Sequence, residues 1–208
     1  DWPEKQFPTK EKLDELFPDR PVLLTRIDGH AAMANQKALD AAGITKAYDL
    51  TGGEIVEENG KPTGMLIDNA IDLVSSKIPD LTKERMKELL LQAQQNCFAV
   101  GLTTIDDCGL DFTAVEGIEQ LQSEGSLKMR LYVMLSDAEK NYDYLIKRGK
   151  VKTDRLNVRG FKVYADGALG SRGACLLHHY SDMPKKRGFL LSDLAHFEKV
   201  AKKIYEND

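Results

Sequence analysis

The sequence lacks the long apolar runs and the one-sided charge that mark several common protein classes. No apolar segment approaches the roughly 20 residues that a membrane-spanning helix needs, and the amino end, DWPEKQFPTKEK, contains no apolar core of a signal peptide. The 29 basic and 33 acidic residues give a net charge of -4 at pH 7, without a long run of one sign. We therefore expect neither a membrane nor a nucleic-acid partner, and we predict a cytoplasmic location.

Cysteine is also scarce, with Cys97, Cys108 and Cys175 widely spaced and in no CxxC arrangement. This spacing argues against a disulfide framework and against a thiolate metal site, so we expect reduced cysteines in the core. The four histidines are too scattered for an HxH or HExxH metal motif. His30, which follows a predicted strand in the sequence DGH, is the best candidate for substrate contact, and the alternative is a capping role for the next helix.

Residues 1–80 combine helix and strand patterns without a regular repeat, and they predict an α+β subdomain. Asn59-Gly60 is a strong hairpin signal between two strand patterns. The alanine-rich stretch 31–42 predicts a helix that Gly43 ends.

Residues 81–208 follow a different pattern, in which strands recur roughly every 25 to 30 residues and each is followed by a helix. Thr82 is a candidate cap for the first helix, and the three expected strands are 102–108, 128–135 and 158–165. A complete (β/α)8 barrel needs about 250 residues, so this alternation predicts an α/β fold with a partial (β/α)8 (TIM) barrel arc of three βα units. A small open three-layer sheet is the alternative.

Lys162 interrupts the apolar strand pattern at 158–165. A buried lysine is unfavourable unless it is paired or neutral. A lowered pKa would make it a base, a Schiff-base nucleophile or an amine able to take up carbon dioxide, and the resulting carbamate could hold two divalent metals. The simpler alternative is a lysine paired with an interior acid. Asp106 and Asp107 alternate in direction along their strand, so only one of them can face the interior of a barrel, and we expect that one to be Asp107.

The loop after this strand carries Asp166 and the glycines Gly167, Gly170 and Gly173 around Arg172. Asp166 is a candidate metal ligand, base or substrate anchor, although Asp-Gly is also a common turn. The glycines and Arg172 could cradle a small anion, which makes a small-anion-binding α/β module an alternative function. The spacing is neither GxGxxG nor GxxxxGK[ST], so nucleotide binding has little support. A tight loop with a local salt bridge explains the same residues.

Several stretches together resemble the amidohydrolase superfamily, specifically amidohydrolase family 3, which includes N-substituted formamide deformylases. The matching stretches are FPTKEKLDELFPDRPVLLTRIDGHAAMANQKAL, GKPTGMLIDNA, GLTTIDDCG and, above all, GFKVYADGALGSRGACLL. The resemblance implies a (β/α)8 hydrolase with one or two divalent metals, usually zinc, that activate water against the C–N bond of a small amide-like substrate.

The resemblance also assigns roles to individual residues. Lys162 matches a strand lysine that is expected to be carbamylated and to bind the metals. Asp166 and Arg172 match the active-site loop. His30 and Asp28 match a motif in a subdomain inserted after the first barrel strand. The resemblance therefore implies that Asp166 and His30 are catalytic and that Asp28, His30 and Arg172 bind substrate.

The remaining metal ligands of the family are expected before Asp1 and after Asp208, and the three strands correspond to barrel strands 2 to 4. We therefore expect an internal fragment that is inactive alone and carries neither a bound metal nor a carbamate at Lys162. The unclosed sheet leaves strand edges that favour self-association.

Overall fold

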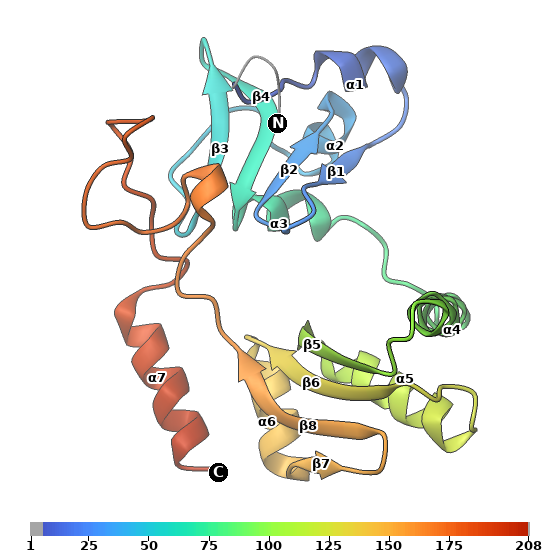
Figure 1. Ribbon diagram of the computed structural model, residues 1–208. Coiled ribbons are helices and arrows are strands. Elements are labelled where there is room, and N and C mark those ends of the chain that lie inside the picture. The colour runs from blue at the N-terminus through green and yellow to red at the C-terminus, as the bar shows by residue number, and fades with distance from the viewer. Residues whose placement is uncertain (1–5, 208) are drawn as a thin grey trace. The chain divides into compact units, whose positions relative to one another are not determined.

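The structure, a computed structural model, describes residues 6–207 and contains two four-stranded sheets in a mixed α/β fold (Figure 1). Residues 1–5 and 208, at the outer ends of the predicted regions 1–80 and 81–208, lie outside the described residues. The chain divides into two compact units. The first contains the chain up to Pro79 together with Ala165–Val200, and the second contains Asp80–Tyr164 together with the residues after Val200. The predicted α/β class is confirmed, and the barrel arc stays a prediction.

The first unit is built on an antiparallel sheet with the order β1-β2-β4-β3. Residues Asn59 and Gly60, with φ of 53° and 74°, connect β3 and β4 and confirm the predicted hairpin. Its elements are α1 (Glu11–Leu16), β1 (Leu23–Thr25), β2 (Ala31–Ala34), α2 (Gln36–Ala41), β3 (Gly53–Glu58), β4 (Lys61–Asp68) and α3 (Ala70–Ser75).

The predicted helix over residues 31–42 is wrong in its first part, because Ala31–Ala34 form the strand β2. All four residues of β2 are buried between β1 and β4, and this tertiary pairing outweighs the helix propensity of alanine. Asn35 marks the change from strand to helix. Its buried side chain accepts from the backbone N–H of Ala38 at the start of α2 and from that of Val22.

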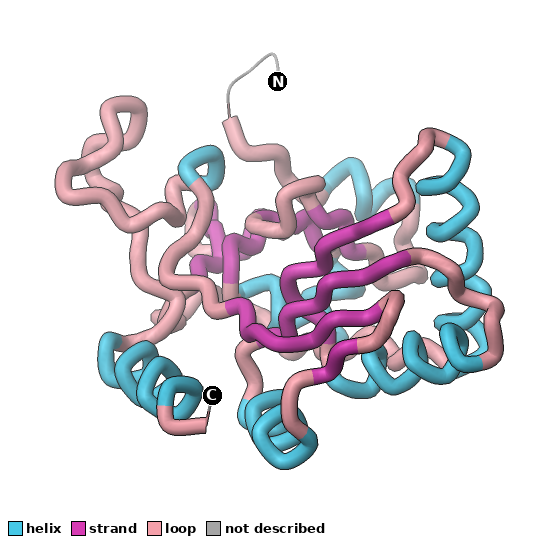
Figure 2. The backbone as a smooth tube through the Cα atoms, turned by 60° about the horizontal axis from the view of Figure 1, so that its bottom comes forward, coloured by secondary structure: helices cyan, strands magenta, loops and turns pink. Residues whose placement is uncertain are grey.

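The second unit is built on a sheet with the order β5-β6-β8-β7, in which β5, β6 and β8 run parallel and β7 pairs antiparallel with β8. Figure 2 shows these strands side by side. Thr82 caps α4 by accepting from the N–H of Arg85, as predicted. The elements are α4 (Lys83–Ala99), β5 (Thr104–Leu110), α5 (Phe112–Ser123), β6 (Arg130–Ser136), α6 (Glu139–Arg148), β7 (Val151–Lys152) and β8 (Leu156–Lys162).

One face of this second sheet packs against α5 and α6. Val133 and Leu135 of β6 are fully buried in that core, whereas Tyr132 and Met134, on the opposite face, are only half-buried. The strand expected at 102–108 is the edge strand β5, and none of its residues is buried. Its residues lie at the sheet edge, and every second one belongs to the face away from the helices.

The cysteines are free, as expected, but their placement in the core was predicted wrongly for two of the three. Cys97 is half-buried, while Cys108 on β5 and Cys175 in the loop after η1 are exposed. Cys108 is exposed because it lies on an edge strand.

After β8 the chain returns to the first unit. Residues 165–200 contain the 3-10 turn η1 (Leu169–Ser171) and lead into α7 (Leu194–Tyr205). The contacts are specific, since Asn69 Nδ2 donates to the carbonyl of Leu191 at 3.0 Å and Lys186 forms an ion pair with Glu54. From the sequence we expected these residues to belong to the region 81–208. A loop without regular structure gives no signal for contacts with residues as distant along the chain as Asn69 and Glu54.

None of the helices formed by residues 6–207 combines the length and the apolar character that spanning a lipid bilayer requires.

We predict that Leu135→Ala will destabilise the second unit by about 2–5 kcal/mol, because the leucine is fully buried and its loss leaves a cavity. Hydrogen exchange of the β6 and β8 amides would measure the effect within that unit. Leu81→Ala is the control, since Leu81 is 61% exposed and its loss should change stability by no more than about 0.5 kcal/mol. Equal protection in both variants would contradict the assignment of this core.

Candidate functional site

Two antiparallel strands bring a histidine and an aspartate together at one end of the first sheet. His30 directly precedes β2 and Asp68 is the last residue of β4, and the adjacent residues Ala31 and Ile67 are paired in register. His30 Nδ1 lies 2.7 Å from Asp68 Oδ1, and the N–H of Asp68 donates to the carbonyl of His30 at 3.3 Å. The ladder between β2 and β4 therefore fixes the backbone of both residues.

The environment of Asp68 is unusual for a carboxylate. Its side chain is 1% exposed, against 23% for His30, and its φ of 47° lies in the left-handed region that few non-glycine residues adopt. Burial raises the pKa of Asp68, and the hydrogen bond with His30 acts in the opposite direction. Oδ2 is buried and finds no hydrogen-bond partner within residues 6–207. A buried unpaired oxygen and a perturbed pKa are features of functional sites.

The glycine loop after β8 encloses this carboxylate. A methyl group added at Gly167 or at Gly173 would collide with Asp68 Oδ2, whereas one at Gly170 would lie in ordinary contact, 3.7 Å from Arg26 Nη1. Two of the three glycines are therefore required by the close approach of the loop to Asp68. The anion that this loop surrounds is a side chain of the protein itself.

Asp28 and Arg26 support the turn that carries His30. The guanidinium of Arg26 donates to both carboxylate oxygens of Asp28, at 2.6 Å each, and Asp28 Oδ1 also accepts from the backbone N–H of His30 at 3.2 Å. The hydrogen bond from Arg26 is the main cause that lowers the pKa of Asp28. Asp28 thus contacts the backbone of His30, and its predicted contact with substrate stays a prediction.

Asp166 and Arg172 make local contacts in the same loop. Asp166 Oδ2 accepts from the N–H of Cys175 at 2.9 Å, which closes the loop between these two residues. Arg172 has a left-handed φ of 61°, donates to the carbonyl of Gly170 at 2.6 Å and forms an ion pair with Asp182. The predicted alternative of a local salt bridge for Arg172 is therefore present, and the catalytic and substrate-binding roles of Asp166 and Arg172 stay predictions.

In the second unit, Lys162 is the last residue of β8 and is paired in register with Ser136 at the end of β6. It therefore lies at the carboxyl edge of the parallel strands, where α/β folds collect catalytic groups. The side chain is half-buried, and its Nζ lies 4.5 Å from the centroid of the Tyr164 ring. No carboxylate within the described part of the chain pairs with it.

The prediction that Asp107 faces a barrel interior on the side of Lys162 is wrong, because the two residues lie on opposite faces of the sheet. Asp107 is paired in register with Val133, which lies in the core covered by helices, and burial raises the pKa of its carboxyl. Asp106 is paired with Tyr132 on the opposite face, the face to which Lys162 belongs by its register with Ser136. Adjacent residues of a strand point to opposite faces, so Asp106 and Asp107 cannot share a face. The register with β6 determines which of the two acids lies on the face of Lys162.

A divalent metal needs more ligands than residues 6–207 supply at one place. Residues 6–207 contain no group of three or more histidine, cysteine or acidic side chains that could hold a metal ion. The position of Lys162 suits one ligand at the carboxyl edge, but the described residues do not complete a site around it.

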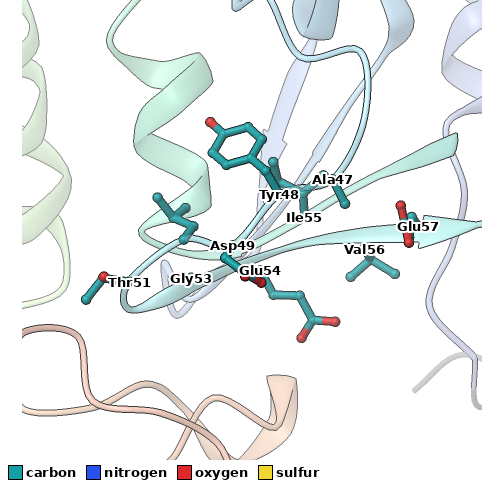
Figure 3. A pocket seen from close by; sticks show the side chains of 10 residues that line it. Ala47, Tyr48, Asp49, Thr51, Gly53, Glu54, Ile55, Val56 and Glu57 are labelled. Carbon is teal, nitrogen blue, oxygen red and sulfur yellow. The ribbon is translucent and has the colours of Figure 1, made fainter. Parts of the chain in front are cut away.

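A hollow of about 620 Å³ lies along β3 and the loop before it (Figure 3). Its lining includes the acidic residues Asp49, Glu54 and Glu57 but no histidine, and Glu54 is already paired with Lys186. None of the residues predicted to be functional lines it.

Sequence reasoning missed two residues of this site, Asp68 and Arg26. Asp68 carries the same signal that drew attention to Asp106 and Asp107, namely an acid at the end of a largely apolar strand. Arg26 carries no signal of its own, because a single arginine beside a turn is ordinary.

Comparisons with known proteins agree on one family. The model described as "Amidohydrolase family" matches residues 1–208. "Putative amidohydrolase YtcJ" of Bacillus subtilis is 36% identical over 205 residues, which cover 92% of this chain. The N-substituted formamide deformylase of Arthrobacter pascens is 33% identical over 134 residues, which are 62% of this chain and 25% of that enzyme. A structure described as an uncharacterized metal-dependent hydrolase from Pyrococcus furiosus superposes with a TM-score of 0.63 at 27% identity and covers 97% of this chain.

The chain spans only part of these relatives, namely 38% of the length of YtcJ and 41% of the Pyrococcus furiosus chain. The similarity therefore bears on the family and on the fold of this part.

We predict that Gly167→Ala will destabilise the first unit by about 1–3 kcal/mol, because its methyl group collides with the buried carboxylate of Asp68. Gly170→Ala is the matched control in the same loop, since its methyl group has room, and it should remain close to wild type. Urea unfolding would compare the two variants. Equal losses of stability would mean that the loop tolerates no side chain at all and that Asp68 is not the cause.

We also predict how Asp68 affects stability as the pH changes. Because its pKa in the folded chain is raised above the ordinary value of 3.8, its contribution to stability is fully present below that value and is lost as the pH rises through the raised pKa. Asp68→Asn removes this titration but keeps the neighbouring charged groups His30, Arg26 and Asp28. The free energy of unfolding of wild type relative to the variant should therefore fall as the pH rises from 3.8 through the raised pKa of Asp68. A difference that does not change with pH would contradict the raised pKa.

Proposed function

Since the chain belongs to the amidohydrolase family, a family of hydrolases, we propose that it forms part of a metal-dependent enzyme that cleaves a non-peptide carbon–nitrogen bond of a small amide-like substrate. The resemblance drawn from the sequence motifs is thereby confirmed. The observation that carries the proposal is the place of Lys162, at the carboxyl edge of parallel strands and without a carboxylate partner in the described chain.

We propose that β5, β6 and β8 are strands 2 to 4 of a (β/α)8 barrel and that residues 1–80 are a subdomain inserted into it. Three parallel strands joined by helices on one face support this assignment. The face that carries Lys162 would then be the barrel interior, and the carboxyl edge would be the catalytic end.

We propose that Lys162 binds the metal as its carbamate. Carbamylation would replace the ammonium with a carboxylate, which is a suitable ligand for zinc or a similar divalent ion. One or two bound metals would supply a water with a pKa near 7. Because the described residues do not complete a site, the other ligands would come from parts of the enzyme that this chain does not include, and the chain alone would be inactive and metal-free.

His30 is the residue of the first unit that we propose to meet the substrate and to hold or move a proton. Its imidazole is partly exposed and fixed on one side by Asp68. Asp28 would contribute through the turn that it stabilises. We propose a substrate-binding role for Arg172 beside its contact with Asp182, and a catalytic role for Asp166 beside its hydrogen bond with the N–H of Cys175.

The alternative of a small-anion-binding module has less support. The space beside Gly167 and Gly173 is filled by the carboxylate of Asp68, and Arg172 is already paired with Asp182. A cytoplasmic location and a small-molecule substrate stay predictions. Self-association would use the open edge of β5, since the edge of β8 is partly covered by β7.

The test is a comparison of the full-length protein with its Lys162→Ala variant. We expect the wild type to bind a divalent metal and to hydrolyse N-substituted formamides or related amides. The variant should lose bound metal, and its kcat/KM should fall by more than about 100-fold, because alanine cannot form the carbamate that holds the metal. Elemental analysis and a hydrolysis assay would measure both properties.

Lys152→Ala is the control, because Lys152 is an exposed lysine on the neighbouring strand β7 and should be dispensable. Added short carboxylic acids should restore part of the activity of Lys162→Ala by taking the place of the carbamate. Unchanged metal content and activity in Lys162→Ala would refute the proposal.

A further inference from the structure

The pairing of His30 with Asp68 defines which ring nitrogen faces the protein. Nδ1 lies 2.7 Å from Asp68 Oδ1, and Nε2, on the other side of the ring, points away from that carboxylate. In a neutral imidazole one nitrogen carries the proton and the other accepts, and the partner of one nitrogen sets the state of the other. An ionised Asp68 can only accept, so it would place the proton on Nδ1.

Asp68 combines three features that an ion pair at the surface does not need. The residue holds a left-handed φ of 47°, its carboxylate is 1% exposed, and two glycines of a distant loop leave room for it. Non-glycine residues rarely adopt this region, and backbone strain of this kind is concentrated at functional sites. The carboxylate of Asp68 is therefore held beside His30 although its backbone is strained and its Oδ2 has no hydrogen-bond partner among the described residues.

Arg26 and Asp28 restrain His30 from its other end. Asp28 accepts from the backbone N–H of His30 at 3.2 Å, and Arg26 holds Asp28 through two hydrogen bonds. The backbone is thus fixed by Asp28 and the ring by Asp68, which leaves the imidazole little freedom to turn.

We propose that Asp68 is a positioning residue that accepts the Nδ1–H of His30 and so presents Nε2 as the proton acceptor toward the substrate. The chemistry assigned to Nε2 depends on the proposed function, whereas the tautomer of His30 does not. Asp68 lies in the stretch GKPTGMLIDNA, to which the sequence assigned no role beyond the family resemblance.

The test is nitrogen NMR of the 208-residue chain with 15N-labelled histidine, in which four imidazoles are observed and His30→Gln identifies the signal of His30. At a pH where His30 is neutral, we expect the proton on Nδ1. In Asp68→Asn this preference should be lost or reversed, because an amide at this place can also donate. A wild-type His30 with its proton on Nε2 would overturn the proposal, and this holds even if the variant does not fold.

Asp28→Asn is the matched control. Asp28 lies two residues from His30 and accepts a hydrogen bond from its backbone N–H, whereas the ring nitrogen Nδ1 is bonded to Asp68. The change at Asp28 should therefore leave the tautomer of His30 as it is. A tautomer that responds to Asp28→Asn and not to Asp68→Asn would overturn the assignment to Asp68.

Activity of the full-length protein separates this inference from the proposed function. If the enzyme hydrolyses amides, Asp68→Asn should lower kcat by at least about tenfold and shift the pH profile on its acid side, with a smaller effect on KM. Absence of amide hydrolysis in the wild type, together with the expected tautomer, would refute the proposed function alone. Full activity of Asp68→Asn would refute the positioning role.

Discussion

The buried carboxylate of Asp68 is the constraint on which the first unit depends. It has to remain beside His30, and the protein covers it with backbone rather than with polar side chains. This explains why glycine is needed at Gly167 and Gly173, since any larger residue would occupy the place of the carboxylate. It also explains why residues 165–200 return to the first unit, where the hydrogen bond from Asn69 to the carbonyl of Leu191 secures them further. The enclosure of Asp68 is thus one of several contacts, with the ion pair of Lys186 and Glu54 among them, that hold residues 165–200 in the first unit.

Local signals in the sequence predicted the regular elements well. Thr82 caps α4 as predicted. The Asn59-Gly60 turn also occurs where the sequence placed it. In each case the deciding interactions lie within a few residues along the chain, so propensity, capping and turn geometry were sufficient. The strand that carries Lys162 was predicted for a related reason, because a run of apolar and β-branched residues has few other interpretations.

The failures have a common physical cause, which is contact between residues far apart in the sequence. Residues 31–34 form a strand because they pair with β1 on one side and with β4 on the other. The local sequence pattern does not indicate this pairing. The choice between Asp106 and Asp107 depended on the register with β6, which alternation alone does not fix. Asp68 was overlooked because its importance comes from His30 and from a loop about a hundred residues later. Asp68 and Arg26 both lie in stretches that carry the family resemblance, but the sequence assigned a role only to Asp28 and His30.

The glycine loop shows that one sequence motif can serve two different physical purposes. Glycines at every third position and an arginine are equally compatible with a cradle for an external anion and with a loop pressed against an internal one. The two cases differ in whether a carboxylate of the chain already fills the space, and here Asp68 does. The segment from Lys162 to Gly173 is continuous in sequence, yet its strand residue belongs to the second unit and its glycines to the first. The motif is specific because one short stretch has to satisfy the carboxyl edge of a parallel sheet and the enclosure of a buried acid at once. A substitution at Gly167 or Gly173 would therefore act on His30 through Asp68.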